Sequence, residues 1–179
     1  MPTPSEFEEI VREHQALVFR TLARLVRSRE HIEDLAQEVF LRLYRGMRHF
    51  RGEAKITTYL YRITLNVAQD EWKRQRGEQS HRSLSDVEAG WENRLVSREK
   101  NAEQSLSQKQ MWAQVENALA ELSATERNVI VLFHQEECTY EQIAVILNLP
   151  VGTVRTHLHR GRQKLREQMR ERMGLCAKT

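Results

Sequence analysis

The sequence predicts an all-α fold in which two small helical domains are joined by a flexible linker. Apolar residues recur at helical spacing along most of the 179-residue chain, so that they fall on one face of each predicted helix. Seven glycines and three prolines are too few for the many turns of an all-β architecture. A charged stretch with weak periodicity separates the helices into two groups, which predicts two domains rather than one.

The first domain is expected to span residues 1–76 and to contain three helices. Apolar spacing places the first over Phe7 to about Val26 and gives the second an apolar face from Ile32 to Met47. Phe50–Lys55 contains a glycine and is typical of a loop, and a third helix is expected from about Thr57 to Arg76.

Residues 77–105 form the predicted linker. Serines, Gly90 and charges of both signs occur there without clear periodicity, which is typical of a flexible segment. As a random coil, its 29 residues would span on the order of 30 Å. We therefore expect the two domains to be independent of one another in the free protein.

The second domain is expected over residues 106–179, and its first helix carries apolar residues from Met111 to Leu122. Capping boxes predict where the next two helices begin. Ser123–Glu126 has the S-x-x-E form and Thr139–Gln142 the T-x-x-Q form, in which side chains satisfy the unpaired amides of the first turn.

The segment Thr139–Arg166 predicts a helix-turn-helix, with a short turn at Asn148–Pro150 and a second helix that begins near Gly152. On that second helix an apolar stripe is formed by Val154, Leu158, Gly161 and Leu165. The opposite side collects Arg155, Thr156, His159, Arg160, Gln163 and Arg166. A recognition helix needs such a face, because Arg and polar side chains contact phosphates and base edges.

Positive charge is concentrated on the same helix. Residues 151–172 contain seven Lys and Arg against two Glu, a local excess of five positive charges that indicates a polyanionic partner. The alternative is an amphipathic surface helix with a solvated basic face. The short turn, the capping boxes and the segregation of arginine together favour DNA binding.

Sequence motifs in both domains extend the interpretation to most of the chain. Gly152–Arg162, together with Leu119–Leu122 and Tyr140–Ala144, resembles the C-terminal domain of the extracytoplasmic-function (ECF) sigma factors. Asp34–Arg45 is similar to the helix with which that family binds core RNA polymerase, and Thr58–Asp70 is similar to its −10-recognition helix. The resemblance implies a protein that binds core RNA polymerase and directs transcription initiation at promoter DNA, with the second domain recognising the −35 element.

The same resemblance gives the first domain its expected sites. On the third helix, a polar stripe lies opposite a buried side of Leu60, Ile63, Thr64 and Val67. Its members, which the resemblance assigns to the −10 element, are Arg62, Asn66, Gln69, Lys73 and Arg76. Together with the Phe50–Lys55 loop they would capture a base flipped out of the duplex. Without the resemblance, Asn66 could equally be a solvated polar residue.

On the second helix, one polar face contains a single apolar residue, Leu41. With the resemblance, this face becomes the polymerase contact, formed by Asp34, Gln37, Glu38, Leu41 and Arg45. The resemblance also implies an anti-sigma factor as a further partner.

Other function classes find little support. His134-Gln135-Glu136 matches the H-x-E of zinc deaminases, but no P-C-x-x-C follows, and His134 with Cys138 would supply only two metal ligands. We expect no enzyme activity, no cofactor and no metal. Cys138 and Cys176 are expected to be free thiols in a cytoplasmic protein, since the N-terminus lacks a signal-peptide pattern and the longest apolar runs have five residues.

Two alternatives to a sigma factor remain. A helix-turn-helix repressor or activator would bind duplex DNA as a dimer without polymerase, but it leaves the polar stripe of the first domain without a use. A pure interaction protein would not need the arginine-rich face of the second domain.

Overall fold

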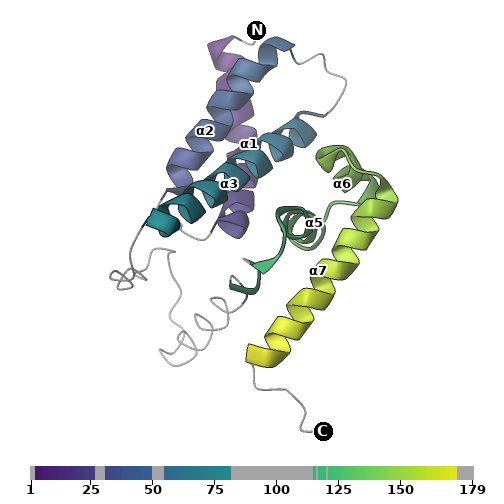
Figure 1. Ribbon diagram of the computed structural model, residues 1–179. Helices are drawn as coiled ribbons and strands as arrows, with labels where there is room; N and C mark the ends of the chain where they lie inside the picture. Colours follow the sequence, from purple (N-terminus) through teal and green to yellow (C-terminus); the bar gives the residue numbers. More distant parts are fainter. Residues whose placement is uncertain are drawn as a thin grey trace, which may run out of the picture.

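The computed structural model describes residues 3–26, 31–49, 55–81, 115, 117–119 and 121–172, and within these ranges it contains helices and no strand. Figure 1 shows the helices, which are α1 (Pro4–Leu25), α2 (Ile32–Gly46), the short 3-10 helix η1 (Met47–His49), α3 (Ile56–His81), α5 (Ala124–His134), α6 (Tyr140–Leu147) and α7 (Val151–Arg172). Residues 115, 117–119 and 121 are also helical. The all-α prediction is confirmed.

The first domain consists of α1, α2 and α3, which pack against one another around a continuous apolar core. Val18 and Leu22 of α1, Val39 and Leu43 of α2, and Leu60 of α3 are all fully buried. The four residues predicted for the buried side of the third helix are buried as well. On the outer surface, the Arg42 guanidinium bonds to the Asp70 carboxylate at 3.1 Å and thereby ties α2 to α3.

Helix α3 continues to His81, five residues beyond the expected end at Arg76. It passes through Gly77, whose place in a helix costs about 1 kcal/mol relative to alanine. The helix formers on either side of Gly77 are sufficient to continue it. The rest of the predicted linker, and the loop residues 50–54, lie outside the described residues.

The second domain is built from α5, α6 and α7, and its core includes Leu132, Ile143, Val154 and Leu158. Both predicted capping boxes are present, at the start of α5 and at the start of α6. No helix in the described part of the chain is long and apolar enough to cross a membrane.

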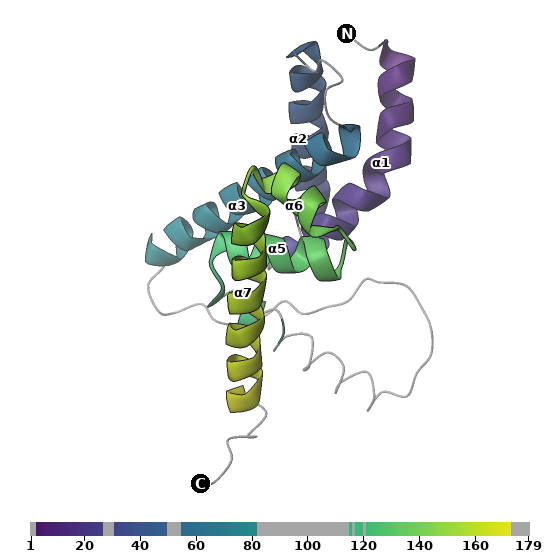
Figure 2. The same ribbon diagram turned by 90° about the vertical axis from the view of Figure 1, so that its right-hand side faces the viewer.

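The two domains lie in contact, which differs from the expectation that they would be independent. Helix α6 packs beside α3, and α5 lies against α1 (Figures 1 and 2). The contact explains why α3 is buried on more than one side. Tyr61 and Leu65, outside the predicted buried side, are 8% and 3% exposed.

Candidate nucleic-acid interface

The helix-turn-helix is held by local backbone geometry that its sequence specifies. Asn148 ends α6 in the left-handed conformation, with φ 53° and ψ 50°, which asparagine tolerates better than most residues. Its amide N–H donates to the last carbonyls of α6. Pro150 follows, and its carbonyl accepts the first hydrogen bond of α7 from the Val154 amide at 3.1 Å. The chain therefore turns within three residues and starts a second helix.

One side of α7 is fixed to the rest of its domain. Val154 and Leu158 are buried, and a Cβ atom at Gly161 would lie 2.8 Å from Cδ1 of Ile130, so α5 and α7 approach most closely there. Two exposed basic residues of this helix also bond to α5. The Lys164 ammonium bonds to both oxygens of the Glu126 carboxylate at 2.9 Å, and Arg162 Nε donates to His134 Nε2 at 3.0 Å.

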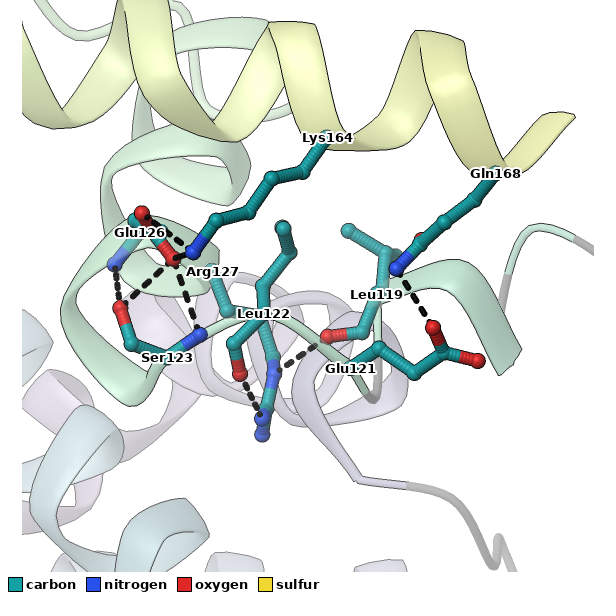
Figure 3. A network of polar contacts seen from close by, with 8 residues as sticks. All are labelled: Leu119, Glu121, Leu122, Ser123, Glu126, Arg127, Lys164 and Gln168. Carbon is teal, nitrogen blue, oxygen red and sulfur yellow. Dashed lines mark hydrogen bonds and ion pairs between the residues drawn. The ribbon is translucent and has the colours of Figure 1, made fainter. Parts of the chain in front are cut away.

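Figure 3 shows the polar network that anchors α7 at its middle. Glu126 is only 4% exposed, and it also accepts hydrogen bonds from the backbone and hydroxyl of Ser123. Burial alone would raise the pKa of the Glu126 carboxyl, but the bonds from Lys164 and Ser123 outweigh it and lower that pKa. One turn further along α7, the Gln168 amide donates to Glu121 at 2.6 Å.

The predicted DNA-facing side of α7 points to solvent. Its six members are all exposed: Arg155, Thr156, His159, Arg160, Gln163 and Arg166. Three of them already have neighbours. Arg155 lies 5.3 Å from the centre of the Tyr140 ring, Thr156 bonds to the Gly152 carbonyl, and Gln163 bonds to Glu167. The C-terminal half of α7 projects away from the first domain (Figures 1 and 2), so the face can meet a large partner.

The polar stripe of α3 is divided into accessible and covered parts. Asn66 and Lys73 are exposed, whereas Arg62 and Gln69 are half-buried. The Arg62 guanidinium donates to the backbone carbonyls of Ile146, at 3.0 Å, and Val145, so it is bonded to the end of α6. Arg76 lies on α3, but its side chain is outside the described residues, as are residues 50–54 of the predicted base-capture loop.

The predicted polymerase face of α2 is largely open. Asp34, Gln37 and Arg45 are exposed, and Leu41 is 49% exposed. Glu38 is half-buried and bonds to Arg42 at 2.7 Å. Tyr44, which the prediction did not include, is a second exposed large apolar residue on this helix, and its ring packs edge-on against Phe7.

Comparison with known proteins finds a family match in each of the two domains. The family model for sigma-70 region 2 matches residues 10–78, and the model for sigma-70 region 4 matches residues 112–165. The chain is 31% identical to the ECF RNA polymerase sigma factor SigW of Bacillus subtilis, over 92% of this chain and 89% of that protein. The chain belongs to the ECF sigma factors. It is therefore a transcription-initiation protein that binds core RNA polymerase and promoter DNA.

Further relatives agree with this family assignment. SigE of Mycolicibacterium smegmatis is 32% identical over 91% of this sigma factor, which spans 61% of the length of that relative. Among solved structures, CnrH in complex with the cytosolic domain of CnrY gives a TM-score of 0.67 at 18% identity, covering 93% of this chain and 89% of that one. RpoE in complex with the anti-sigma factor NepR from Bartonella quintana gives 0.66 at 18% identity, covering 92% and 96%. These likenesses confirm the fold.

The sigma factor has one polar cluster that sequence reasoning did not find. The Glu136 side chain, in the turn between α5 and α6, is completely buried, and its partners come from the other domain. Arg20 of α1 donates to it from Nη2 at 2.6 Å and from Nε at 3.1 Å, and the Tyr61 hydroxyl of α3 donates at 3.0 Å. Burial and the Glu136 carboxylate raise the pKa of Tyr61, which keeps its hydroxyl a donor.

No local signal marks this cluster in the sequence. Arg20 and Glu136 are 116 positions apart, and each has the charge expected of an ordinary surface residue. Within the described ranges, no three His, Cys, Asp or Glu side chains come together as a metal site.

Proposed function

We propose that this sigma factor recognises the −35 element through the outward face of α7. The observation that carries the proposal is the division of α7 into two sides. Cations on one side, such as Lys164, are bonded within the domain, while the six predicted contact residues on the other side are exposed. Arg155 and Arg160, near the start of the helix, are the candidates for base edges, and Arg166 is the candidate for a phosphate contact.

We propose that the stripe on α3 captures an unstacked base of the −10 element. Asn66 can offer both a donor and an acceptor to a base edge, and Lys73 can bind a phosphate. Both are exposed. Arg62, Gln69 and Arg76, with the Phe50–Lys55 loop, would complete the site. Base extrusion costs a few kcal/mol, which hydrogen bonds in such a site can offset.

The face of α2 is our candidate for the polymerase contact. Leu41 lies among Asp34, Gln37, Glu38 and Arg45, an arrangement of an apolar centre with a charged rim that suits a protein interface. The exposed ring of Tyr44 would enlarge the apolar centre.

Regulation by an anti-sigma factor is the second part of the proposal. The solved relative RpoE is bound to the anti-sigma factor NepR, and we propose that a protein of this kind also restrains the present chain. We further propose that the sigma factor acts in the cytoplasm as a binding protein without enzyme activity, since its polar clusters serve binding and anchoring.

Gel filtration with core RNA polymerase, followed by run-off transcription, tests the polymerase contact. The wild-type chain should co-elute with core and support transcription, and Leu41→Asp should weaken co-elution by placing a charge at the apolar centre. Phe19→Asp is the matched control, because Phe19 is also an exposed large apolar residue but lies on α1. Co-elution of Leu41→Asp equal to that of the control would remove α2 from the interface, and no co-elution of the wild type would contradict the polymerase role itself.

A further inference from the structure

The contact between the two domains contains a buried carboxylate whose side-chain partners belong to the other domain. Glu136 belongs to the second domain and its side chain is 0% exposed, yet its carboxylate accepts hydrogen bonds from Arg20 and Tyr61 of the first domain. An ionised carboxylate is buried at a cost of several kcal/mol unless charged and hydrogen-bonding partners offset it. Here four hydrogen bonds, three from Arg20 and one from Tyr61, do so, and the geometry holds α1, α3 and the α5–α6 turn in one relative position.

A second connection uses a residue of the −10 stripe itself. The carbonyls at the end of a helix lack intrahelical partners and carry partial negative charge. The Arg62 guanidinium donates to two carbonyls in the last turn of α6, those of Ile146 and Val145, and the Val145 carbonyl also accepts from the Asn148 amide. In this arrangement the helix-turn-helix domain occupies a cation that the −10 element would need.

A third connection lies further along α3. The Arg127 guanidinium, which is bonded to the carbonyls of Leu119 and Leu122, stacks 3.9 Å from the centre of the Trp72 ring. The Trp72 indole N–H is in turn bonded to the Leu25 carbonyl at 2.6 Å. Helix α3 thus contacts the second domain on both sides of Asn66, through Arg62 and through Trp72.

The domain contact is nevertheless incompletely packed. A cavity of about 490 Å³ remains between α3 and the second domain, lined by Gln69, Trp72 and Lys73 on one side and Ser123, Arg127 and Lys164 on the other. Protein cores are close-packed, whereas polar contacts between domains of one chain resemble transient interfaces. Buried apolar side chains of the two domains also join in one cluster, so separation of the domains exposes some of them to solvent.

We propose that the helix-turn-helix domain autoinhibits the free sigma factor by docking on the −10 helix, with the Glu136 cluster as the latch. The inference rests on the proposed −10 role of α3. In the closed chain Arg62 is engaged and Gln69 is half-buried, while the −35 face of α7 is exposed. Binding of −10 DNA requires α6 to leave α3. For core polymerase to bring about this opening, it must bind the open chain more tightly than the closed one.

The latch is tested in the full chain through Cys138, which is 8% exposed and lies two residues after Glu136. Cys176→Ser leaves it as the single thiol. Arg20→Gln should make labelling of Cys138 by a small maleimide about 10-fold faster, the effect of losing one charge-assisted hydrogen-bonded pair. Loss of the Arg20 cation would by itself disfavour the thiolate form of Cys138 and slow its reaction with maleimide. Faster labelling therefore reports greater exposure of Cys138. Arg12→Gln, at an exposed arginine of the same helix, is the matched control and should label at the wild-type rate.

A second measurement separates opening from simple loss of stability. A single-stranded −10 oligonucleotide should bind free Arg20→Gln about 10-fold more tightly than the wild type or Arg12→Gln, because the competent fraction rises. Tyr61→Phe, which removes one bond of the cluster, should shift both measurements in the same direction by a smaller factor, and it keeps the test decisive if Arg20→Gln folds poorly.

The possible failures point to different conclusions. Wild-type labelling and oligonucleotide affinity in both Arg20→Gln and Tyr61→Phe would overturn the latch and leave the sigma function untouched. Faster labelling with unchanged oligonucleotide affinity would overturn autoinhibition, since the domains would open without exposing the −10 site. If the opened variants and the wild type alike failed in run-off transcription with core, the proposed promoter function would fail instead.

Discussion

Arg155 and Arg160 lie on the first half of α7, and both side chains are exposed on the side opposite buried Val154 and Leu158. Replacing either arginine with alanine should cost about 1–3 kcal/mol of binding at the −35 element, because a bidentate contact to a base edge would be lost. Affinities on matched and mutated −35 duplexes provide the measurement. The loss should be large on the matched duplex and small on the mutated one.

Arg166 supplies the comparison within the same helix. If Arg166 contacts a phosphate, Arg166→Ala should weaken binding to both duplexes alike. It should also reduce the slope of log affinity against log salt concentration by about 1. Equal losses on the two duplexes for Arg155→Ala and Arg160→Ala would contradict base recognition and leave them as phosphate contacts.

Glu126 gives the second prediction for a single residue. Its pKa is lowered in the folded chain, so the carboxylate contributes stability above its unfolded pKa and loses that contribution as the pH falls through the folded pKa. Glu126→Gln should therefore lower the free energy of unfolding at pH 7 by about 1 kcal/mol, a modest value because Lys164 is half exposed, and the difference from wild type should shrink in acid. Urea unfolding at pH 7 and below pH 4 measures both.

A matched control is available on the next helix. Glu141→Gln also removes one carboxylate, but from an exposed position on α6. If the two variants lost equal stability with equal pH dependence, the Lys164–Glu126 bond would not anchor α7.

Among the elements, α7 depends on close approach to α5 at Gly161. A Cβ there would lie 2.8 Å from Cδ1 and 3.3 Å from Cγ1 of Ile130. Gly161→Ala should be nearly neutral, because a gain in helix propensity of about 1 kcal/mol offsets the shift of the Ile130 side chain. Gly161→Val should lower the free energy of unfolding by about 2 kcal/mol through overpacking.

Gly152, at the start of the same helix, is the control for this prediction. A Cβ at that position would meet nothing within 4 Å, so valine there should be tolerated. Urea unfolding of the three variants and the wild type decides. A valine that costs the same at both positions would show that the approach of α5 and α7 is not tight.

The elements themselves were largely predictable from the sequence. Capping boxes located the starts of α5 and α6 to within two residues, and apolar periodicity found α1, α2, α3 and α7. The end of α3 was missed because Gly77 and the charged residues after it are as typical of a linker as of an exposed helix end. Its second buried side was missed because Tyr61 and Leu65 are covered by another domain, which periodicity within one helix does not report.

At the scale of the whole molecule, the relative position of the domains was not predictable. It depends on Arg20 meeting Glu136 and on Arg62 meeting backbone carbonyls, and a backbone carbonyl has no sequence signature at all. The expected DNA-facing residues show the same limit. Residue type and helical phase placed all six on the exposed side of α7. On α3 the same reasoning placed Asn66 and Lys73 on an exposed side, but it did not predict that the second domain partly covers Arg62.

The last prediction concerns promoter opening, which requires both domains to act on one promoter. Asn66 is exposed on α3 between two covered stretches of that helix. If it captures an unstacked −10 base, Asn66→Ala should leave −35 binding and association with polymerase nearly unchanged while open-complex formation falls, because the energy that offsets base extrusion is lost. A promoter pre-melted across the −10 element removes part of that cost and should restore part of the opening. Permanganate footprinting of unpaired thymines on duplex and pre-melted templates measures it, with Gln15→Ala, an exposed amide on α1, as the control. Wild-type opening by Asn66→Ala on the duplex template would show that Asn66 is solvated surface, and the −10 site on α3 would have to be assigned elsewhere.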